Sequence, residues 1–392
     1  MPEFLTPNVH IEEISIGNQP IEGTSTSTAA FVGVTAKGPQ NDPKIVESFA
    51  AYSEIFGLAS PNLPVSIAAL QFFSNGGRKA VIVRVLASEK RGEFRPEPEQ
   101  LIGDSEALTG IHALGLSEPI GLLLTPDAAN MPAGDAKKVA EAVLKFCQGR
   151  RIFHILELPQ DSSQQKAVQA VVSWSAQNDA IKHRNAAVYF PRITISDPSG
   201  ENGTLQVPPS GAVAGLYARI DLERGVWKAP AGLNAKLPTA RGVEIDLTDQ
   251  DMARLKDASI NPIRHFADHG IVAWGARTFL AADDNKNWRY LPVRRLALFI
   301  EESLYRGLVW AVFESNDEAL WAQIRLAASS FMNQLFRSGA FQGSHASEAY
   351  SVRCSRETMT ESDIDARRII LQVGFAPLKP AEFIILHIEL CS

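Results

Sequence analysis

The sequence has few cysteines, no cysteine motif and no long apolar run. Cys147, Cys354 and Cys391 are isolated, with no CxxC or Cys/His spacing, which argues against a disulfide scaffold and a zinc site. No apolar run reaches the ~18 residues that a membrane-spanning helix needs. The opening Met1-Pro2-Glu3 lacks the basic and apolar regions of a signal peptide. We therefore expect no membrane insertion and synthesis in a reducing compartment.

The sequence also lacks the usual motifs of nucleotide, metal and nucleophile sites. No GxxxxGK[ST], GxGxxG, HExxH or GxSxG occurs, and the histidines are scattered. The formal net charge of −6 gives no basic face of the kind that nucleic acid binds. We expect no cofactor and no nucleic-acid partner.

What is present is the composition of a soluble globular protein with room for two or three domains: 392 residues, 45% hydrophobic and 21% charged. Its middle part, about 96–225, alternates apolar strands with helical segments. The strands are expected at Gly121–Thr125, Ile152–Leu158 and Ala186–Phe190. This alternation predicts a parallel sheet covered by helices on both faces.

Three aspartates follow these strands, and they are the one enzyme-like signal. Asp127, Asp161 and Asp197 come just past strand ends, where open α/β sheets bind ligands and where carboxylates could hold Mg²⁺ for hydrolysis. The stronger interpretation is structural, because Asp161 stands at a helix N-cap position and Asp127 lies in a Pro-Asp turn. We expect no catalytic, cofactor or metal residue, and keep a metal-dependent hydrolase as a remote alternative.

The last third is strongly patterned. Strands are expected at 271–278 and 288–291, then a helix from Pro292 to about Val312 and a second from Asn316 to Ser338, with Ser315 and Glu318 as its capping box. The second helix has an apolar stripe and a polar face. Arg325 and Arg337 are the only charges near the C-terminal half of that face.

Both ends of the chain carry strand patterns. Val9 and Ile11 share one face of an N-terminal strand, and Ile14 and Ile16 share the other. Residues 1 to about 23 are therefore predicted to form an arm, with a frayed terminus as the alternative.

The stretch 367–390 contains two apolar strands joined by a connector with Pro377 and Pro380 but without a tight-hairpin signal. The last strand is therefore expected not to fold back on its predecessor. The residues alone favour a crossover to a distant edge of the same sheet, with donation to another subunit as the alternative.

Six blocks, in order along the chain, resemble the tail sheath proteins of contractile phage tails. They are TSTSTAAFVGVTAKGP (24–39), FFSNGGRKAVIVRV (72–85), VPPSGAVAGLYARIDLERGVWKAPAG (207–232), VAWGARTF (272–279), WRYLPVRRL (288–296) and KPAEFI (379–384). The resemblance implies a mixed α/β (α+β) fold. It divides the chain into an arm (1–23), a conserved sheath domain in two parts (24–95 and 226–378), an inserted outer α/β domain (96–225) and a C-terminal arm strand (379–392).

The resemblance also implies that both termini mesh with neighbouring subunits, which reverses the preference for the last strand. The expected intersubunit strand residues are Val9, Ile11, Ile14, Ile16, Phe383, Ile384, Ile385, Leu386, Ile388 and Leu390. The conserved domain would line the inside of a sleeve. We expect Arg325, Gln334 and Arg337 to face an acidic tube, unless these arginines are solvated or pair with glutamates of their own domain.

The function that the resemblance implies is mechanical. Many copies would polymerise helically around a tail tube and contract, driving the tube through the host envelope without enzymatic activity. The expected partners are the chain itself, the tube protein, and baseplate and tail terminator proteins, in a virion made in the bacterial host cytoplasm. The sheath of a type VI secretion or extracellular contractile injection system is the alternative.

Overall fold

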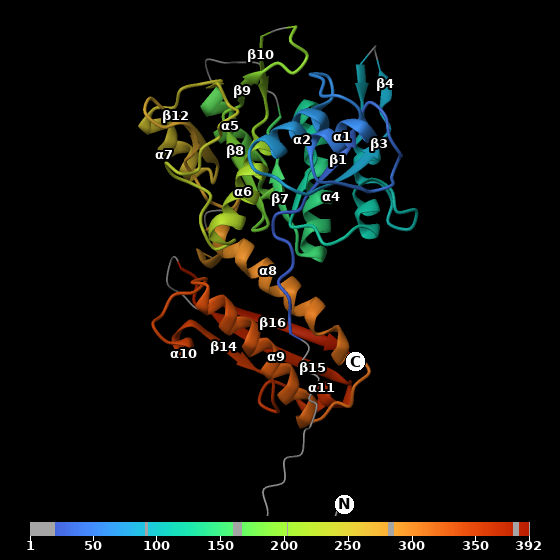
Figure 1. Cartoon of the computed structure of the whole chain (residues 1–392), viewed down its shortest axis with the longest axis vertical. Coiled ribbons are helices and arrows are strands. Elements are labelled where there is room, and N and C mark those ends of the chain that lie inside the picture. The colour runs from blue at the N-terminus through green and yellow to red at the C-terminus, as the bar shows by residue number, and fades with distance from the viewer. Residues whose placement is uncertain are drawn as a thin grey trace, which may run out of the picture.

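The computed structural model describes residues 20–90, 93–159, 167–201, 203–280, 286–378 and 384–391. These residues form two bodies joined by one long helix, α8 (Leu291–Gly307), as Figure 1 shows. The upper body holds a large sheet between helices, and the lower body packs helices on a small sheet. Among the described residues, no helix combines the length and apolar character that crossing a bilayer requires.

An eight-stranded sheet organises the upper body. Neighbouring strands are parallel from β12 to β3, and the two edge strands, β13 and β2, are antiparallel to their neighbours. The parallel sheet predicted from the alternating pattern is thus confirmed. In spatial order the strands are β13 (Gly270–Ala273), β12 (Asn261–Phe266), β8 (Ala186–Phe190), β7 (Phe153–Leu156), β6 (Leu122–Leu124), β1 (Ala29–Val34), β3 (Ala80–Val85) and β2 (Lys44–Val46).

Side chains that alternate between the two faces of the central strands contribute to two separate hydrophobic cores. In β1, Phe31 belongs to the core under α2 and α6, whereas Val32 belongs to the core under α4. Side chains of successive strand residues point to opposite faces, so a strand buried on both faces must be apolar throughout. The helices of this body are α1 (Phe49–Phe56), α2 (Pro64–Ser74), α3 (Pro98–Ile102), α4 (Ala133–Arg150), α5 (Ala167–Gln177), α6 (Ser210–Arg224) and α7 (Asp249–Asp257), with 3-10 turns η1 (Gly110–Leu116), η2 (Pro126–Asn130) and η4 (Asp179–Ile181).

Small residues set the close packing of α2 against α6. A Cβ added to Gly215 would lie 2.4 Å from the Phe72 carbonyl oxygen, and one added to Gly211 would lie equally close to the Ala68 carbonyl. Only glycine allows the two backbones to approach in this way. Two smaller sheets complete the upper body: β10 (Thr204–Val207), β9 (Ile193–Ser196) and β11 (Gly242–Val243), and the pair β4 (Ser88–Lys90) and β5 (Glu93–Arg95).

The lower body packs α8 and α9 (Glu318–Arg337) on a three-stranded sheet. The predicted core stripes of both helices are buried, including Ile300 and Leu304 of α8 and Ile324 and Phe331 of α9. Its remaining elements are η5 (Lys286–Trp288), η6 (Val309–Ala311), α10 (Ala346–Ala349), β14 (Tyr350–Arg353), α11 (Glu361–Asp365), β15 (Arg368–Phe375) and β16 (Ile384–Cys391).

The pairing of the last strand contradicts the expectation that this strand does not fold back on its predecessor. β16 lies antiparallel to β15 over its whole length, with Ile384 opposite Phe375 and Cys391 opposite Arg368. The two prolines of the connector exclude a tight hairpin turn but not a wide one. In a single chain, the free edge of β15 is the nearest row of unpaired N–H and C=O groups.

Smaller differences from the sequence have local causes. Residues 288–291 were expected to be a strand, yet Trp288 ends a 3-10 turn and α8 begins at Leu291. The N-cap of α9 is Asp317, whose carboxylate accepts from the Leu320 N–H at 2.9 Å, rather than Ser315. The eight-stranded sheet also runs across the domain boundary expected between residues 95 and 96.

Candidate functional site

A buried ion pair joins the two bodies. The Arg295 guanidinium of α8 donates to both Asp221 carboxylate oxygens of α6, at 2.9 and 2.6 Å. Its Nη2 also donates to the Thr26 carbonyl at 3.0 Å, and the Thr26 hydroxyl donates to Asp221 at 2.7 Å. The side chains of the pair are only 3% and 4% exposed. A bidentate pair with further hydrogen bonds is geometrically specific, so these three residues, here called the junction, fix α8 to the upper body.

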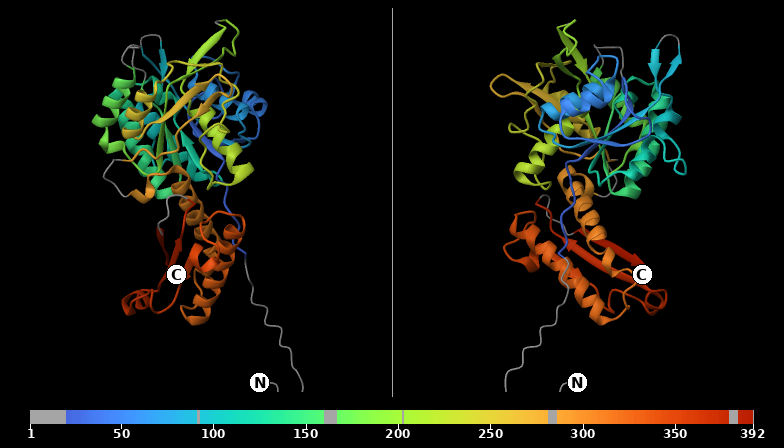
Figure 2. Two further views of the ribbon diagram at one scale, coloured as in Figure 1. Left: turned by 90° about the vertical axis from the view of Figure 1, so that its left-hand side faces the viewer. Right: turned by 45° about the vertical axis from the view of Figure 1, so that its right-hand side comes forward.

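Contacts on either side extend the junction along α8. The neighbouring Arg294 donates to Asn185 Oδ1 at 2.7 Å and to Glu301 at 3.0 Å. Nearer the lower body, the Thr24 N–H donates to the Ser303 hydroxyl at 3.0 Å. Residues 20–28 therefore run beside α8 from the lower body to β1, as both views of Figure 2 show. The segment and the helix therefore form two adjacent connections between the bodies.

The crevice at the carboxyl end of the large sheet is filled by the protein itself. The strand order reverses between β1 and β6, and such switch points are where α/β sheets usually bind ligands. Here Asp127, in η2, is buried and accepts from the Val34 N–H at 3.0 Å. A Cβ on Gly33 would overlap the Asp127 carboxylate. Burial raises the pKa of this carboxyl to about 7.

Asp197, the other described candidate, bonds within its own turn. Asp197 accepts from the N–H and the hydroxyl of Ser199, at 2.9 and 2.7 Å, in a turn after β9. Asp161 lies outside the described residues. The carboxyl that does lie near Asp127 is Glu157, after β7, whose pKa burial raises to about 8. Within the described ranges, no three potential ligands gather into a metal site.

The predicted arm residues fall at the limits of the described chain. Val9, Ile11, Ile14, Ile16 and Phe383 lie outside it. The remaining ones are in β16, whose backbone pairs with β15 at the edge of the lower sheet: Ile384, Ile385, Leu386, Ile388 and Leu390. The sheet thus ends in the strand that the sequence singled out.

The predicted tube-facing residues lie on α9, but not in equivalent settings. Gln334 and Arg337 are exposed. Arg325 is half-buried, donates to Glu318 at 2.9 Å and also donates to the Cys354 carbonyl. Arg325 therefore pairs with a glutamate of its own domain, which is the alternative considered for it. Arg337 is the better candidate for an outside contact.

Sequence reasoning missed the junction. Arg294 and Arg295 follow Pro292 and Val293 in a helix with an apolar stripe, and two consecutive arginines beside such a stripe are unusual for a solvated face. Glu301, a partner of Arg294, lies on the same helix. Asp221 and Asn185 come from α6 and from the loop before β8, which no local pattern could indicate.

These features define a class: a two-body mixed α/β subunit, its sheet crevice closed from within and its small sheet ending in an edge strand. Residues 110–279 match the phage tail sheath protein central domain, and residues 283–390 match the phage tail sheath C-terminal domain. The chain belongs to the phage tail sheath protein family.

Sequence relatives and solved structures support this family assignment. A prophage major tail sheath protein of Pseudomonas aeruginosa is 23% identical over 95% of this chain and 93% of its own. The tail sheath protein of Vibrio phage KVP40 is 25% identical over 46% of this chain, which spans only 26% of that relative.

Two cryo-EM sheath structures match over nearly the whole chain. The helical sheath of the anti-feeding prophage in its contracted state has a TM-score of 0.74 and 29% identity, over 98% of this chain and 99% of that one. The contracted PVC sheath complex, from an extracellular contractile injection system, also scores 0.74 with 28% identity, over 98% of both chains.

Proposed function

We propose that this protein is the sheath subunit of a contractile particle: copies assemble helically around a tube and shorten together, pushing the tube through a cell envelope. The match over 98% of the chain to a contracted helical sheath carries the proposal. The role is mechanical and non-enzymatic. Asp127 and Asp197, the described candidates for catalysis, bond to nearby groups of the same chain.

Electron microscopy of the purified chain tests this proposal directly. Without tube or baseplate, the protein should form tubes or rings whose lattice corresponds to a contracted sheath. A protein that stays monomeric at high concentration under all ionic conditions would contradict the proposal.

The particle is proposed to be a phage tail, with a type VI secretion or extracellular contractile injection system as the alternative. Relatives of both kinds match over nearly the whole chain, since the PVC sheath of an extracellular contractile injection system is 28% identical and the prophage tail sheath protein is 23% identical. Genome neighbours decide between them: capsid and terminase genes indicate a phage virion, and an effector cassette indicates an injection particle. In either case the proposed partners are the tube protein, the baseplate and a terminator protein.

The contraction is proposed to consume no nucleotide. The sequence has no phosphate-binding loop, so the work must come from an extended assembly that is less stable than the contracted one. Purified particles should shorten without ATP when triggered by mild denaturant. Shortening that requires ATP hydrolysis would contradict this.

β16 is proposed to exchange between subunits. Its main-chain pairing with β15 would be equally available to the same strand of another copy, as in domain swapping. The N-terminal arm, residues 1–23, is proposed to mesh with neighbours as well.

A reversible disulfide tests the exchange of β16. Val373 and Leu386 are opposite each other in the register, so V373C/L386C in a Cys391→Ser background should lock the strand onto its own chain when oxidised as a monomer. We expect locked monomers not to polymerise and dithiothreitol to restore polymerisation. Oxidation after assembly should instead link chains covalently. Equal polymerisation of locked and reduced monomers would rule out exchange.

A further inference from the structure

A turn after α8 places a phenylalanine in an unfavourable backbone conformation and in solvent. Phe313 is 94% exposed and has φ +73°. The Glu314 N–H donates to the Ala311 carbonyl at 3.3 Å, and Val312 has φ −70° and ψ 131°. These angles are those of a type II turn, whose third position favours glycine or asparagine.

Such a residue is costly in the isolated chain on two counts, because the positive φ strains a bulky side chain and the ring is left in water. Strained positions that persist are concentrated at functional sites. This Phe313 turn (Ala311–Glu314) and the residues after it carry acidic side chains, because Glu314 and Asp317 are both exposed.

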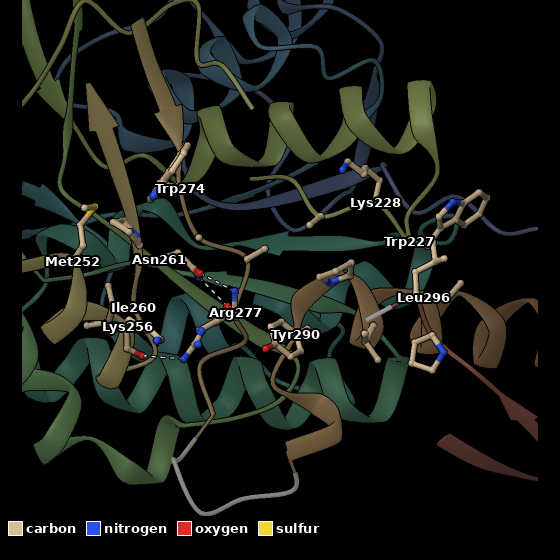
Figure 3. A pocket seen from close by; sticks show the side chains of 18 of the residues that line it. Trp227, Lys228, Met252, Lys256, Ile260, Asn261, Trp274, Arg277, Tyr290 and Leu296 are labelled. Carbon is tan, nitrogen blue, oxygen red and sulfur yellow. Dashed lines mark hydrogen bonds between the residues drawn. The ribbon is translucent and has the colours of Figure 1, made fainter. Parts of the chain in front are cut away.

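A concave surface with basic rather than acidic side chains lies between α7, β13 and the start of α8. Its volume is about 820 Å³. Figure 3 shows Met252, Lys256 and Trp274 toward one end and Trp227, Lys228 and Leu296 toward the other. Its described lining is aromatic and aliphatic, with Lys228, Lys256 and Arg277 as its charged side chains and no acidic one. We call it the basic groove.

The chain cannot fill its own groove with its own Phe313. The groove is lined by the first two turns of α8, from Pro292 to Leu296, whereas Phe313 follows the far end of this helix. α8 has 17 residues, which corresponds to about 25 Å at 1.5 Å per residue, and the junction holds it in place. Any such contact must therefore join two copies.

We propose that the Phe313 turn of one subunit docks into the basic groove of the next. The aromatic ring enters the apolar lining, and the acidic side chains of the turn and of the residues after it face the groove lysines. Two different surfaces meet in this contact, so every bound copy presents a new free turn and a new free groove. Heterologous contacts of this kind generate rings or open helices. The proposal deepens the proposed sheath function and rests on it.

The position of the groove links this contact to the C-terminal strand. Pro377 and Leu378, which begin the connector to β16, form part of the groove lining. A docked turn therefore contacts the segment that determines where β16 can reach. Docking and strand exchange would then be coupled events between the same two subunits.

Photo-crosslinking in assembled tubes identifies the occupant. A benzoylphenylalanine at Trp274, 38% exposed in the groove, should capture the peptide that contains Phe313 of another copy. Capture of residues 1–19, of a tube protein or of no peptide would overturn the proposal while leaving tubes, and the sheath function, intact. A wild-type chain that forms no polymer would overturn the sheath function and this contact together.

Substitutions provide a second, independent test of this contact. Phe313→Gly suits the type II turn, so it should leave the melting temperature unchanged or raise it, yet raise the protein concentration needed for polymerisation at least tenfold. Leu58→Ala, at another strongly exposed apolar residue (77% exposed), is the matched control and should polymerise normally. Lys256→Glu and Glu314→Lys should each weaken assembly, and the combined variant should recover part of the loss. Normal assembly of Phe313→Gly would overturn the contact.

Discussion

The two bodies bury their sheets in different ways. The upper sheet is covered on both faces, and its central strands alternate between two apolar cores. The lower sheet has three strands, of which β15 lies in the middle and β16 at one edge. Both sheets have edge strands with a single neighbour, which are β13 and β2 in the upper sheet and β14 and β16 in the lower one. Of these four, only β16 is also the last strand along the described chain. The proposed strand exchange would therefore change the lower sheet and leave the upper sheet as it is.

Removing β16 should have the largest effect, and this effect should differ between the two bodies. Deletion of residues 381–392 removes eight residue pairs of the β15–β16 ladder, each hydrogen bond contributing about 0.5–1.5 kcal/mol net. We expect a folded monomer with an unchanged upper body that no longer polymerises. Circular dichroism and electron microscopy measure the two outcomes. A truncated chain that assembles, or one that cannot fold, would contradict the comparison.

Breaking the junction should cost more stability than any surface change. Arg295→Met leaves the buried Asp221 unpaired, and losing one partner of a buried pair costs about 3–5 kcal/mol. Arg295→Met with Asp221→Leu should recover much of the loss. The exposed pair Lys79–Glu118 is the control, where Lys79→Met should cost below about 1 kcal/mol. Urea unfolding measures all three, and equal costs for the two pairs would refute a structural role for the junction.

The upper body should lose stability as the pH rises. Burial raises the pKa of Asp127 to about 7 and of Glu157 to about 8. Between pH ~4 and these values, the unfolded chain releases protons that the folded chain retains. Each group therefore lowers the free energy of unfolding by about 1.4 kcal/mol per pH unit. Asp127→Asn with Glu157→Gln should therefore flatten the pH dependence between pH 5 and 8. Parallel profiles of variant and wild type, measured by urea unfolding, would contradict this.

The smallest effect on stability is expected at α9. Arg337→Glu changes an exposed side chain and should shift unfolding by less than about 0.5 kcal/mol. If α9 faces an acidic tube, the variant should still self-assemble but should not form extended sheath on tubes, and high salt should weaken the wild type similarly. Arg325→Glu is a poorer test, because Arg325 also bonds to Glu318 and Cys354. Normal extended tails with Arg337→Glu would place the tube contact elsewhere.

Local pattern predicted the buried elements well. β8 covers the expected residues 186–190, and the stripes of α8 and α9 are buried, because periodicity reports directly which face meets a core. The expectation that the last strand does not fold back on its predecessor is wrong, since pairing depends on which edge is free in three dimensions. The partner of Arg295 could not be predicted, because Asp221 is remote from it in sequence. The positive φ of Phe313 could not be predicted either, because that position of a type II turn favours glycine or asparagine rather than phenylalanine.

The seam between residues 20–28 and α8 has a consequence for how the chain is made. Thr24 bonds to Ser303, 279 residues later, and Thr26 bonds to Arg295, 269 residues later. At 5–20 residues per second, a ribosome needs roughly 13–56 s to synthesise that interval. During this time β1 can pair with β3, but the segment before it has no helix to lie against. A nascent chain therefore cannot form this seam until α8 has emerged from the ribosome.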